Sequence, residues 1–392
     1  MTLAPYAMDA RNSRGRRYPE PPHPYRSAYA RDRDRVIHAR AFRRLESKTQ
    51  VFTTRFSDHF RNRLTHTIEV AQVARTVARA LGLNEDLTEA LALVHDVGHP
   101  PFGHGGEKQL DLCMGEYGDR FDHNLHALRI VEQFEQRYLD FPGLNLTFEV
   151  REGIIKHSRD YSAKEFPGLQ EYLLEKRPPL EAQLIDLVDE IAYNTADLDD
   201  SFEARLLDLE KLCSEIPFFD AAYREVERRH PKGARKLKFN EALKRVLNRL
   251  VTDLIEETQR QVDVSGVQNV EDVRSHEKRL AAFSAEVARH AAALKSFLTS
   301  NVYSLPVIAE ERERSVAALD ALFRFYVAQP GKMPRHYADL AQKTPIHRVV
   351  CDYVAGMTDH FLLRQCSELL VGVNSSESTG MKSPRSTKEI TR

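Results

Sequence analysis

The sequence predicts an all-α fold, and three observations support this prediction. Apolar residues recur at helical spacing from Arg63 to Leu81 and again from Leu180 to Asp200. The chain from Phe202 to about Leu370 is helical in pattern, with long segments such as EALKRVLNRLVTDLIEETQRQV. Runs that read as strands are few.

Composition limits the class of protein. The chain has 392 residues, of which 42% are hydrophobic and 29% are charged, as in ordinary soluble globular proteins. A net charge of −1 gives no overall basic field that would attract nucleic acid. No apolar run approaches the roughly 20 residues of a membrane-spanning helix, and the first residues lack the apolar core of a signal peptide. Four scattered cysteines without a CxxC pair indicate reduced core residues and a cytoplasmic location.

The first fifty residues fall into two parts. Residues 1–30 are rich in Arg, Pro and Tyr, which predicts a flexible N-terminal arm, or one that crosses to another subunit. The stretch Arg31–Gln50 is predicted to be helical, with a rough apolar stripe among arginines. Its cationic face is either solvated or partly in contact with a polyanionic ligand.

Helix signals and breaks organise the rest of the chain. Gly82 is predicted to end the helix that begins at Arg63, and Asn84 to cap a helix over residues 85–97. Residues 161–179 carry charges and three prolines and predict a loop. The polar tail, residues 373–392, is predicted to be disordered.

A dense cluster of ligand-type residues lies in LALVHDVGHPPFGHGGE, residues 91–107. A predicted helix ends in His95 and Asp96, and the glycine and prolines that follow stop it and form a rigid turn. Neighbouring helix residues point about 100° apart. Both side chains therefore reach one ion only if the ion lies between helices and other helices supply further ligands.

The sequence offers those further ligands. His66 lies in a predicted helix upstream, and Asp189 lies in one downstream. Two histidines and two carboxylates make a nitrogen–oxygen site for a divalent ion, with Mg or Mn preferred and Fe, Co, Ni or Zn as alternatives. The simpler interpretation is that His95 is a core histidine and Asp96 a helix-end residue.

Side chains around this cluster suggest phosphate binding and proton transfer. Arg63 shares a helix face with His66, which suits a phosphate oxygen or a plain salt bridge. His104 and Glu107 are three residues apart and form a workable acid/base pair. Lys156 is either a phosphate ligand or a surface lysine.

A second line of polar residues follows the last of these helices. Asp189, Tyr193 and Asp197 are spaced by four, so they stack on one helix face beside the apolar positions. Three polar groups in line beside an apolar face are unusual for solvation alone.

Six ordered blocks resemble the deoxyguanosine triphosphate triphosphohydrolases, a family of HD-domain phosphohydrolases. The resemblance runs from about residue 30 to 370, and its blocks are Arg31–Phe52, Arg63–Val70, His95–Glu107, Val150–Ser158, Asp189–Asp200 and Asp352–Asp359. It implies an HD-domain helical bundle as catalytic core, residues 31–202, with a helical C-terminal region, residues 203–372, completing the fold. It also implies cleavage of dGTP or other dNTPs at the α-phosphorus, giving a deoxynucleoside and inorganic triphosphate.

The resemblance implies a role for individual residues. Gln50 would face the deoxyribose, and Tyr193 and Asp197 would hold its 3′-hydroxyl, with Tyr193 crowding out a 2′-hydroxyl. His123 matches a pocket histidine. The resulting site has metal ligands His66, His95, Asp96 and Asp189; catalytic residues His99, His104, Glu107 and His123; and substrate-binding residues Gln50, Arg63, Lys156, Tyr193 and Asp197.

Several alternatives remain open at this stage. The chain resembles the shorter triphosphohydrolase-like branch, for which several dNTPs, an activating nucleotide or both are expected, so the base is not assigned. A homo-oligomer is expected from resemblance alone, and weak binding of single-stranded DNA is left open by the basic arm. Rival functions are another HD-type nucleotide phosphohydrolase or phosphodiesterase, and a non-catalytic nucleotide sensor.

Overall fold

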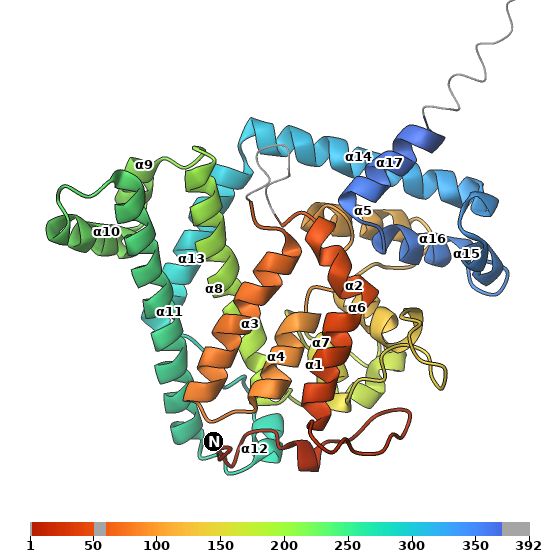
Figure 1. The fold of residues 1–392 in the computed structure, drawn as a ribbon, viewed down its shortest axis with the longest axis horizontal. Coiled ribbons are helices and arrows are strands. Elements are labelled where there is room, and N and C mark those ends of the chain that lie inside the picture. Colours follow the sequence, from red (N-terminus) through yellow and green to blue (C-terminus); the bar gives the residue numbers. More distant parts are fainter. Residues whose placement is uncertain (1, 51–59, 371–392) are drawn as a thin grey trace, which may run out of the picture.

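The computed structural model describes residues 2–50 and 60–370, and over these ranges the chain is helical with no β-strand (Figure 1). This confirms the predicted all-α fold. The α-helices are α1 Ala28–His38, α2 Arg40–Arg44, α3 Arg63–Ala80, α4 Glu85–Val94, α5 Gly103–Gly115, α6 His123–Arg129, α7 Phe148–Ile155, α8 Leu180–Glu203, α9 Leu209–Glu215, α10 Pro217–Arg229, α11 Arg235–Ser265, α12 Val270–Ser275, α13 Ala285–Leu298, α14 Pro306–Ala328, α15 Arg335–Leu340, α16 Ile346–Ala355 and α17 Asp359–Leu369.

Helices α1, α3, α4 and α8 pack together at the centre of the molecule (Figure 1). Val77 of α3, Leu87 of α4 and Val188 of α8 are among the fully buried residues of one large apolar core. Burial of such side chains is the main favourable contribution to folding. Because the predicted metal ligands lie on α3, at the end of α4 and on α8, core packing also sets their separation.

Local signals place both ends of α3 and the start of α4 as predicted, whereas α4 ends at Val94, before the predicted end at residue 97. Asn62 accepts a hydrogen bond from the Thr65 backbone N–H at 2.9 Å, and Thr65 Oγ1 accepts one from the Asn62 N–H, a capping box that starts α3. Gly82 adopts a φ of +68° where the chain leaves α3. Asn84 caps α4 by accepting from Leu87 N–H.

The stretch Arg31–Gln50 is not one helix. Helix α1 begins at Ala28, and Ala39 takes extended backbone angles that separate it from α2. The Ala41 N–H at the start of α2 donates to Glu135 Oε1 at 2.7 Å. A carboxylate 94 residues away thus satisfies a helix-start donor, which local periodicity cannot reveal.

A second apolar core joins the C-terminal region to α5. Leu110 of α5, Phe323 of α14 and Val350 of α16 lie in it, and α14 packs along α5 (Figure 1). Helix α5 carries His104 and Glu107, so the C-terminal region supports that part of the site. No helix among the described residues is long and apolar enough to cross a membrane.

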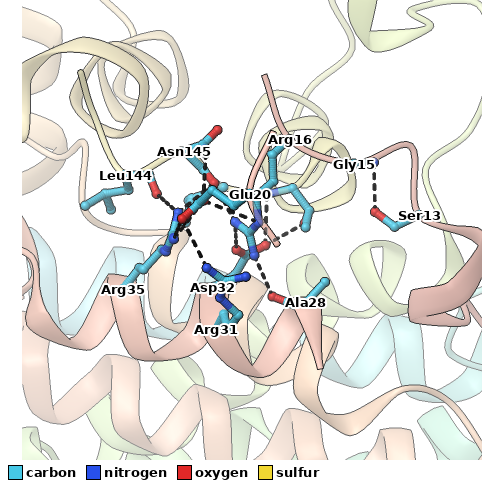
Figure 2. Close-up of polar contacts among 12 residues, drawn as sticks. Ser13, Gly15, Arg16, Glu20, Ala28, Arg31, Asp32, Arg35, Leu144 and Asn145 are labelled. Atoms are coloured by element: carbon cyan, nitrogen blue, oxygen red, sulfur yellow. Dashed lines mark hydrogen bonds and ion pairs between the residues drawn. The ribbon is translucent and has the colours of Figure 1, made fainter. Parts of the chain in front are cut away.

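The N-terminal segment packs against the body, which corrects the expectation of a flexible arm. Met8 N–H donates to Glu181 Oε1 at 2.9 Å. Arg16 pairs with Asp32 at 2.5 Å, and Glu20 accepts from Arg35 at 2.7 and 2.8 Å (Figure 2). Arg16 and Arg35 are thus paired with carboxylates of the same chain. The predicted disordered tail lies outside the described residues.

Candidate functional site

The four predicted metal ligands converge from three helices. His66 Nε2 lies 2.8 Å from Asp189 Oδ1, and His95 Nε2 lies 3.7 Å from the same oxygen and 3.5 Å from Asp96 Oδ1. Ligand atoms of His66, His95 and Asp96 all lie within 4.8 Å of one another, and the three residues are buried. This compact set of two imidazoles and two carboxylates, all buried except the partly exposed Asp189, fits a divalent metal ion.

Neighbouring groups orient these ligands. His95 Nδ1 lies 2.6 Å from the Ala92 carbonyl, which leaves Nε2, an atom without a hydrogen-bond partner among the described residues, as the one that would bind a metal once it loses its proton. Burial disfavours ionised Asp96, but Arg63 and His95 hold the pKa of its carboxyl well below its usual value. Burial would lower the pKa of His95, but the carboxylates of Asp96 and Asp189 raise it to about 9. A divalent ion between these two carboxylates would take the place of the proton on His95.

A second group lies beside the first. Glu107 Oε1 is 2.7 Å from His123 Nδ1, and its other oxygen is 3.4 Å from His104 Nδ1. Burial would raise the pKa of Glu107, but both imidazoles hold it well below its usual value, so the carboxylate stays ionised. His99 stacks on His123 with ring centroids 4.0 Å apart. Burial, with the nearby cation of Arg63, lowers the pKa of His99, which favours its neutral form.

A cavity of about 360 Å³ opens onto both groups. The His104 side chain is 83% exposed and lines it, whereas the buried His95 lies behind the wall. Two lining groups, Gln50 Oε1 and the Tyr193 hydroxyl, are buried without a hydrogen-bond partner among the described residues. Ten predicted site residues line the cavity: Gln50, Arg63, His66, Asp96, His99, His104, His123, Asp189, Tyr193 and Asp197.

Arg63, for which the sequence left open a phosphate contact or a salt bridge, makes a salt bridge with Asp96. Its Nη1 lies 2.8 Å from Asp96 Oδ2, while its Nε has no hydrogen-bond partner among the described residues. The guanidinium therefore holds Asp96 in place and still lines the cavity.

Lys156 does not belong to the site, which corrects the prediction for it. Its ammonium is buried and donates to Glu152 Oε1 at 2.8 Å and to the carbonyls of Leu173 and Lys176 at 2.8 and 2.7 Å. All three donors of the ammonium are used, so a phosphate has no access to it. The neighbouring His157 lines the cavity instead.

Replacing Lys156 with Met is therefore expected to destabilise the fold and leave catalysis unchanged. Two partly buried carbonyls would lose a donor, which costs about 1–3 kcal/mol, while Glu152 would keep Arg274 at 2.7 Å. Urea unfolding measures the loss, and kcat/KM should stay within about twofold. The exposed Lys164→Met is the control. A large fall in kcat/KM with unchanged stability would contradict this prediction and show that Lys156 takes part in substrate binding or catalysis.

Sequence reasoning missed several residues that line the cavity near Tyr193 and Asp197. Lys295 lies over the Tyr193 ring at 5.6 Å, and the Tyr303 hydroxyl donates to Asp197 Oδ2. Arg312 and Lys295 are exposed cations that line the same cavity. These residues come from α13, the turn after it and α14, where no motif marks them; only the packing of α13 on α8 brings them to the site.

Asp197 carries a stability cost that depends on pH. Burial raises the pKa of its carboxyl to about 7, although the hydrogen bond from Tyr303 opposes this. In the unfolded chain the carboxyl ionises near pH 3.9. Because the folded-state pKa is the higher one, the cost is absent below pH 4, grows as pH rises, and is complete above pH 7.

Asp197→Asn is accordingly expected to unfold with a free energy up to about 4 kcal/mol higher than wild type at pH 8. The difference should shrink towards zero near pH 4. Urea unfolding of the metal-free protein at several pH values measures it. Asp199→Asn, a half-exposed neighbour paired with Arg61 at 2.9 Å, should show no such gain. A difference that is constant with pH would contradict the assignment.

Two protein families match parts of this chain and identify its class. Residues 63–194 match the HD domain family, and residues 281–368 match the phosphohydrolase-associated domain family. The first match runs from the start of α3, which carries His66, into α8, which carries Asp189. The fold and the site thus define an HD-domain phosphohydrolase.

Relatives narrow this class. The deoxyguanosinetriphosphate triphosphohydrolase-like protein of Bordetella pertussis is 44% identical over 367 residues, covering 93% of this chain and 95% of the relative. The like-named protein of Paracoccus denitrificans is 44% identical over 377 residues, covering 94% and 99%. That of a Caulobacter species is 43% identical over 379 residues, covering 93% and 96%. The chain belongs to this family of deoxyguanosinetriphosphate triphosphohydrolase-like proteins.

Proposed function

We propose that this protein is a metal-dependent dNTP triphosphohydrolase, which converts a dNTP and water into a deoxynucleoside and inorganic triphosphate. The observation that carries the proposal is one cavity that three kinds of side chain line together. They are the candidate metal ligands His66, Asp96 and Asp189; the histidines His104 and His123, which Glu107 links; and the candidate sugar contacts Gln50, Tyr193 and Asp197. The names of its relatives support the same reaction class.

The deoxyribose would bind at the α8 wall. Gln50 and Tyr193 each offer a buried polar atom that lacks a partner among residues 2–50 and 60–370. A buried polar group of this kind favours a ligand that supplies its hydrogen bond. At a pH below its raised pKa, the Asp197 carboxyl would be protonated and would face the 3′-hydroxyl. The Tyr303 hydroxyl donates to its Oδ2. The ring of Tyr193 would fill the space that a 2′-hydroxyl needs.

The triphosphate would lie towards the exposed cations. Lys295 and Arg312 line the cavity from α13 and α14, and Arg63 lies at its inner end. These three charges would replace Lys156 as the phosphate contacts. Cations aimed at phosphate oxygens stabilise the charge that develops there during transfer.

His104 would carry the catalytic proton, either taking it from water or giving it to the leaving 5′-oxygen. Glu107 orients the ring through Nδ1 and leaves Nε2 for the substrate. His123 contacts the other oxygen of the Glu107 carboxylate, and the His99 ring stacks on the His123 ring. The three imidazoles therefore lie together on one side of the cavity. A bound divalent ion would polarise a phosphoryl oxygen or acidify water.

Product analysis tests this function. The purified protein with Mg or Mn would be given each dNTP alone and in mixture, and each NTP, and products separated by ion exchange. We expect deoxynucleoside and triphosphate from dNTPs and far less product from NTPs, with mixtures revealing base choice and any activation. Pyrophosphate or phosphate as product would indicate another HD-type hydrolase, and no turnover would indicate a sensor.

A further inference from the structure

Two segments of the active-site cavity lie outside the helices and depend on other parts of the chain for their position. One is residues 48–50, the Gln50 segment, and the other is residues 99–102, the His99 turn between α4 and α5. Both contribute residues to the lining of the cavity. A side chain that acts on a substrate must be held to within about 0.5 Å. Contacts from outside these two segments must therefore fix them.

Asp359, at the start of α17, joins these two segments. Its Oδ2 accepts a hydrogen bond from Thr49 N–H at 2.8 Å, and its Oδ1 accepts one from Phe102 N–H at 3.0 Å. Hydrogen bonds from backbone N–H groups to a carboxylate are stronger than those between neutral groups. One side chain of the C-terminal region thus holds the Gln50 segment and the His99 turn together.

A buried lysine makes a second connection between the same parts of the chain. Lys48 Nζ donates to the His99 carbonyl at 2.5 Å and to the carbonyl of Ala355, the last residue of α16, at 3.2 Å. The turn that joins α16 to α17 is therefore attached to both active-site segments, through Ala355 at one end and Asp359 at the other. In Figure 1, α16 lies against α5, which begins directly after the His99 turn.

Phe102 shows why the His99 turn needs this support. Its φ of +64° lies in the left-handed region, which is unfavourable for a residue that carries a side chain. Phe102 is also the N-cap of α5 and makes no side-chain capping hydrogen bond to that helix. Such a conformation persists only where the surrounding structure holds it. The hydrogen bond from Phe102 N–H to Asp359 is one of the contacts that do so.

We propose that Asp359 is a positioning residue for the dNTP hydrolysis described above, and this inference rests on that proposed function. Through Thr49, Asp359 would hold Gln50 at the deoxyribose. Through Phe102, it would hold the first turn of α5, which carries the candidate acid/base histidine. Residues 281–368, which match the phosphohydrolase-associated domain family, would then set the distance between the sugar contacts and the imidazoles of the site.

Asp359→Ala is expected to change the substrate preference as well as the rate. Both N–H groups would lose their acceptor, so the Gln50 segment and the His99 turn could separate. We expect kcat/KM for dNTPs to fall roughly 10²-fold, because a small misplacement of reacting groups has this effect. The preference for dNTPs over NTPs should fall about tenfold, whereas a role in stability alone would lower both rates in proportion. Asp359→Asn, which keeps one acceptor oxygen, should give smaller changes.

Hydrogen exchange tests the contact itself without turnover. Exchange at the amides of Thr49 and Phe102 would be followed on the full chain by mass spectrometry with fragmentation, in wild type, Asp359→Ala and Glu368→Ala. Glu368 is the matched control, because it is an exposed carboxylate on the same helix and does not line the cavity. We expect both amides to exchange about tenfold faster or more in Asp359→Ala and at the wild-type rate in Glu368→Ala. Exchange within α17 should stay unchanged, because the Thr358 side chain caps this helix in each variant.

Three outcomes would overturn the proposal. Unchanged exchange at both amides in Asp359→Ala would show that Asp359 does not hold the two segments. Faster exchange throughout α17 would show a general loss of structure in the variant. Faster exchange at both amides with an unchanged preference for dNTPs would show that Asp359 stabilises the fold without positioning the site. Triphosphate release by wild type is measured first, so a failure of the proposed function is seen separately from each of these outcomes.

Discussion

Replacing Asp189 with Asn is expected to reduce dNTP hydrolysis by roughly 10³-fold or more, because a metal supplies several kcal/mol of stabilisation to the reaction. The substitution keeps the shape of the side chain and removes the charge that both His66 and His95 face. Bound metal per chain, measured by mass spectrometry after dialysis, should fall in parallel. Burial disfavours ionised Asp189, yet His66 and His95 hold its pKa well below its usual value, so the native carboxylate is charged at working pH.

Asp199→Asn is the matched control on the same helix. Asp199 pairs with Arg61 at 2.9 Å and does not line the cavity, so its loss should leave metal content and rate near those of wild type. Full activity of Asp189→Asn with normal metal content would contradict the proposed ligand set. Equal losses in both variants would indicate a general defect of α8.

His104→Ala is expected to lower kcat by about 10²–10⁴-fold, the usual contribution of a positioned acid or base. The side chain is 83% exposed, so its removal leaves no buried hole and the unfolding free energy should hardly change. Metal content should also stay at the wild-type level, which separates this variant from Asp189→Asn. Stopped-time assays of triphosphate release at saturating dNTP measure the effect.

The Glu107→Gln variant tests whether Glu107 and His104 act together in catalysis. An amide at this position weakens the orientation and charge that the carboxylate gives to His104 and His123. We expect a smaller fall in kcat than in His104→Ala, and little further loss in the double variant, because the two residues act as one unit. Independent, multiplicative losses would show that His104 and Glu107 work separately.

Local and motif information in the sequence was sufficient for the fold class and for the core of the site. Periodicity and caps such as Asn84 depend on residues close in sequence, so α3 could be predicted with its ends and α4 with its start, although α4 ends at Val94 and not at residue 97. The metal-type residues could be predicted because one ion needs ligands from several helices and the chain offers His66 and Asp189 around His95 and Asp96. The structure brings these four together.

Long-range contacts set the limits of that reasoning. The break at Ala39 depends on Glu135, and the packed N-terminal segment depends on partners such as Glu181 and Asn145. Lys156 and His157 are adjacent, and only the fold decides that the lysine turns to Glu152 while the histidine reaches the cavity. Lys295 and Arg312 become phosphate candidates only once α13 and α14 cover α8 and α5.

The most direct test of the proposed reaction is hydrolysis in water enriched in ¹⁸O, with mass spectrometry of both products. Attack on the α-phosphorus with the 5′-oxygen as leaving group places the label in inorganic triphosphate and none in the deoxynucleoside. We expect that result, with no label transfer in Asp189→Asn. Label in the nucleoside, or in a nucleoside monophosphate released with pyrophosphate, would contradict it and assign this cavity to a different phosphohydrolase reaction.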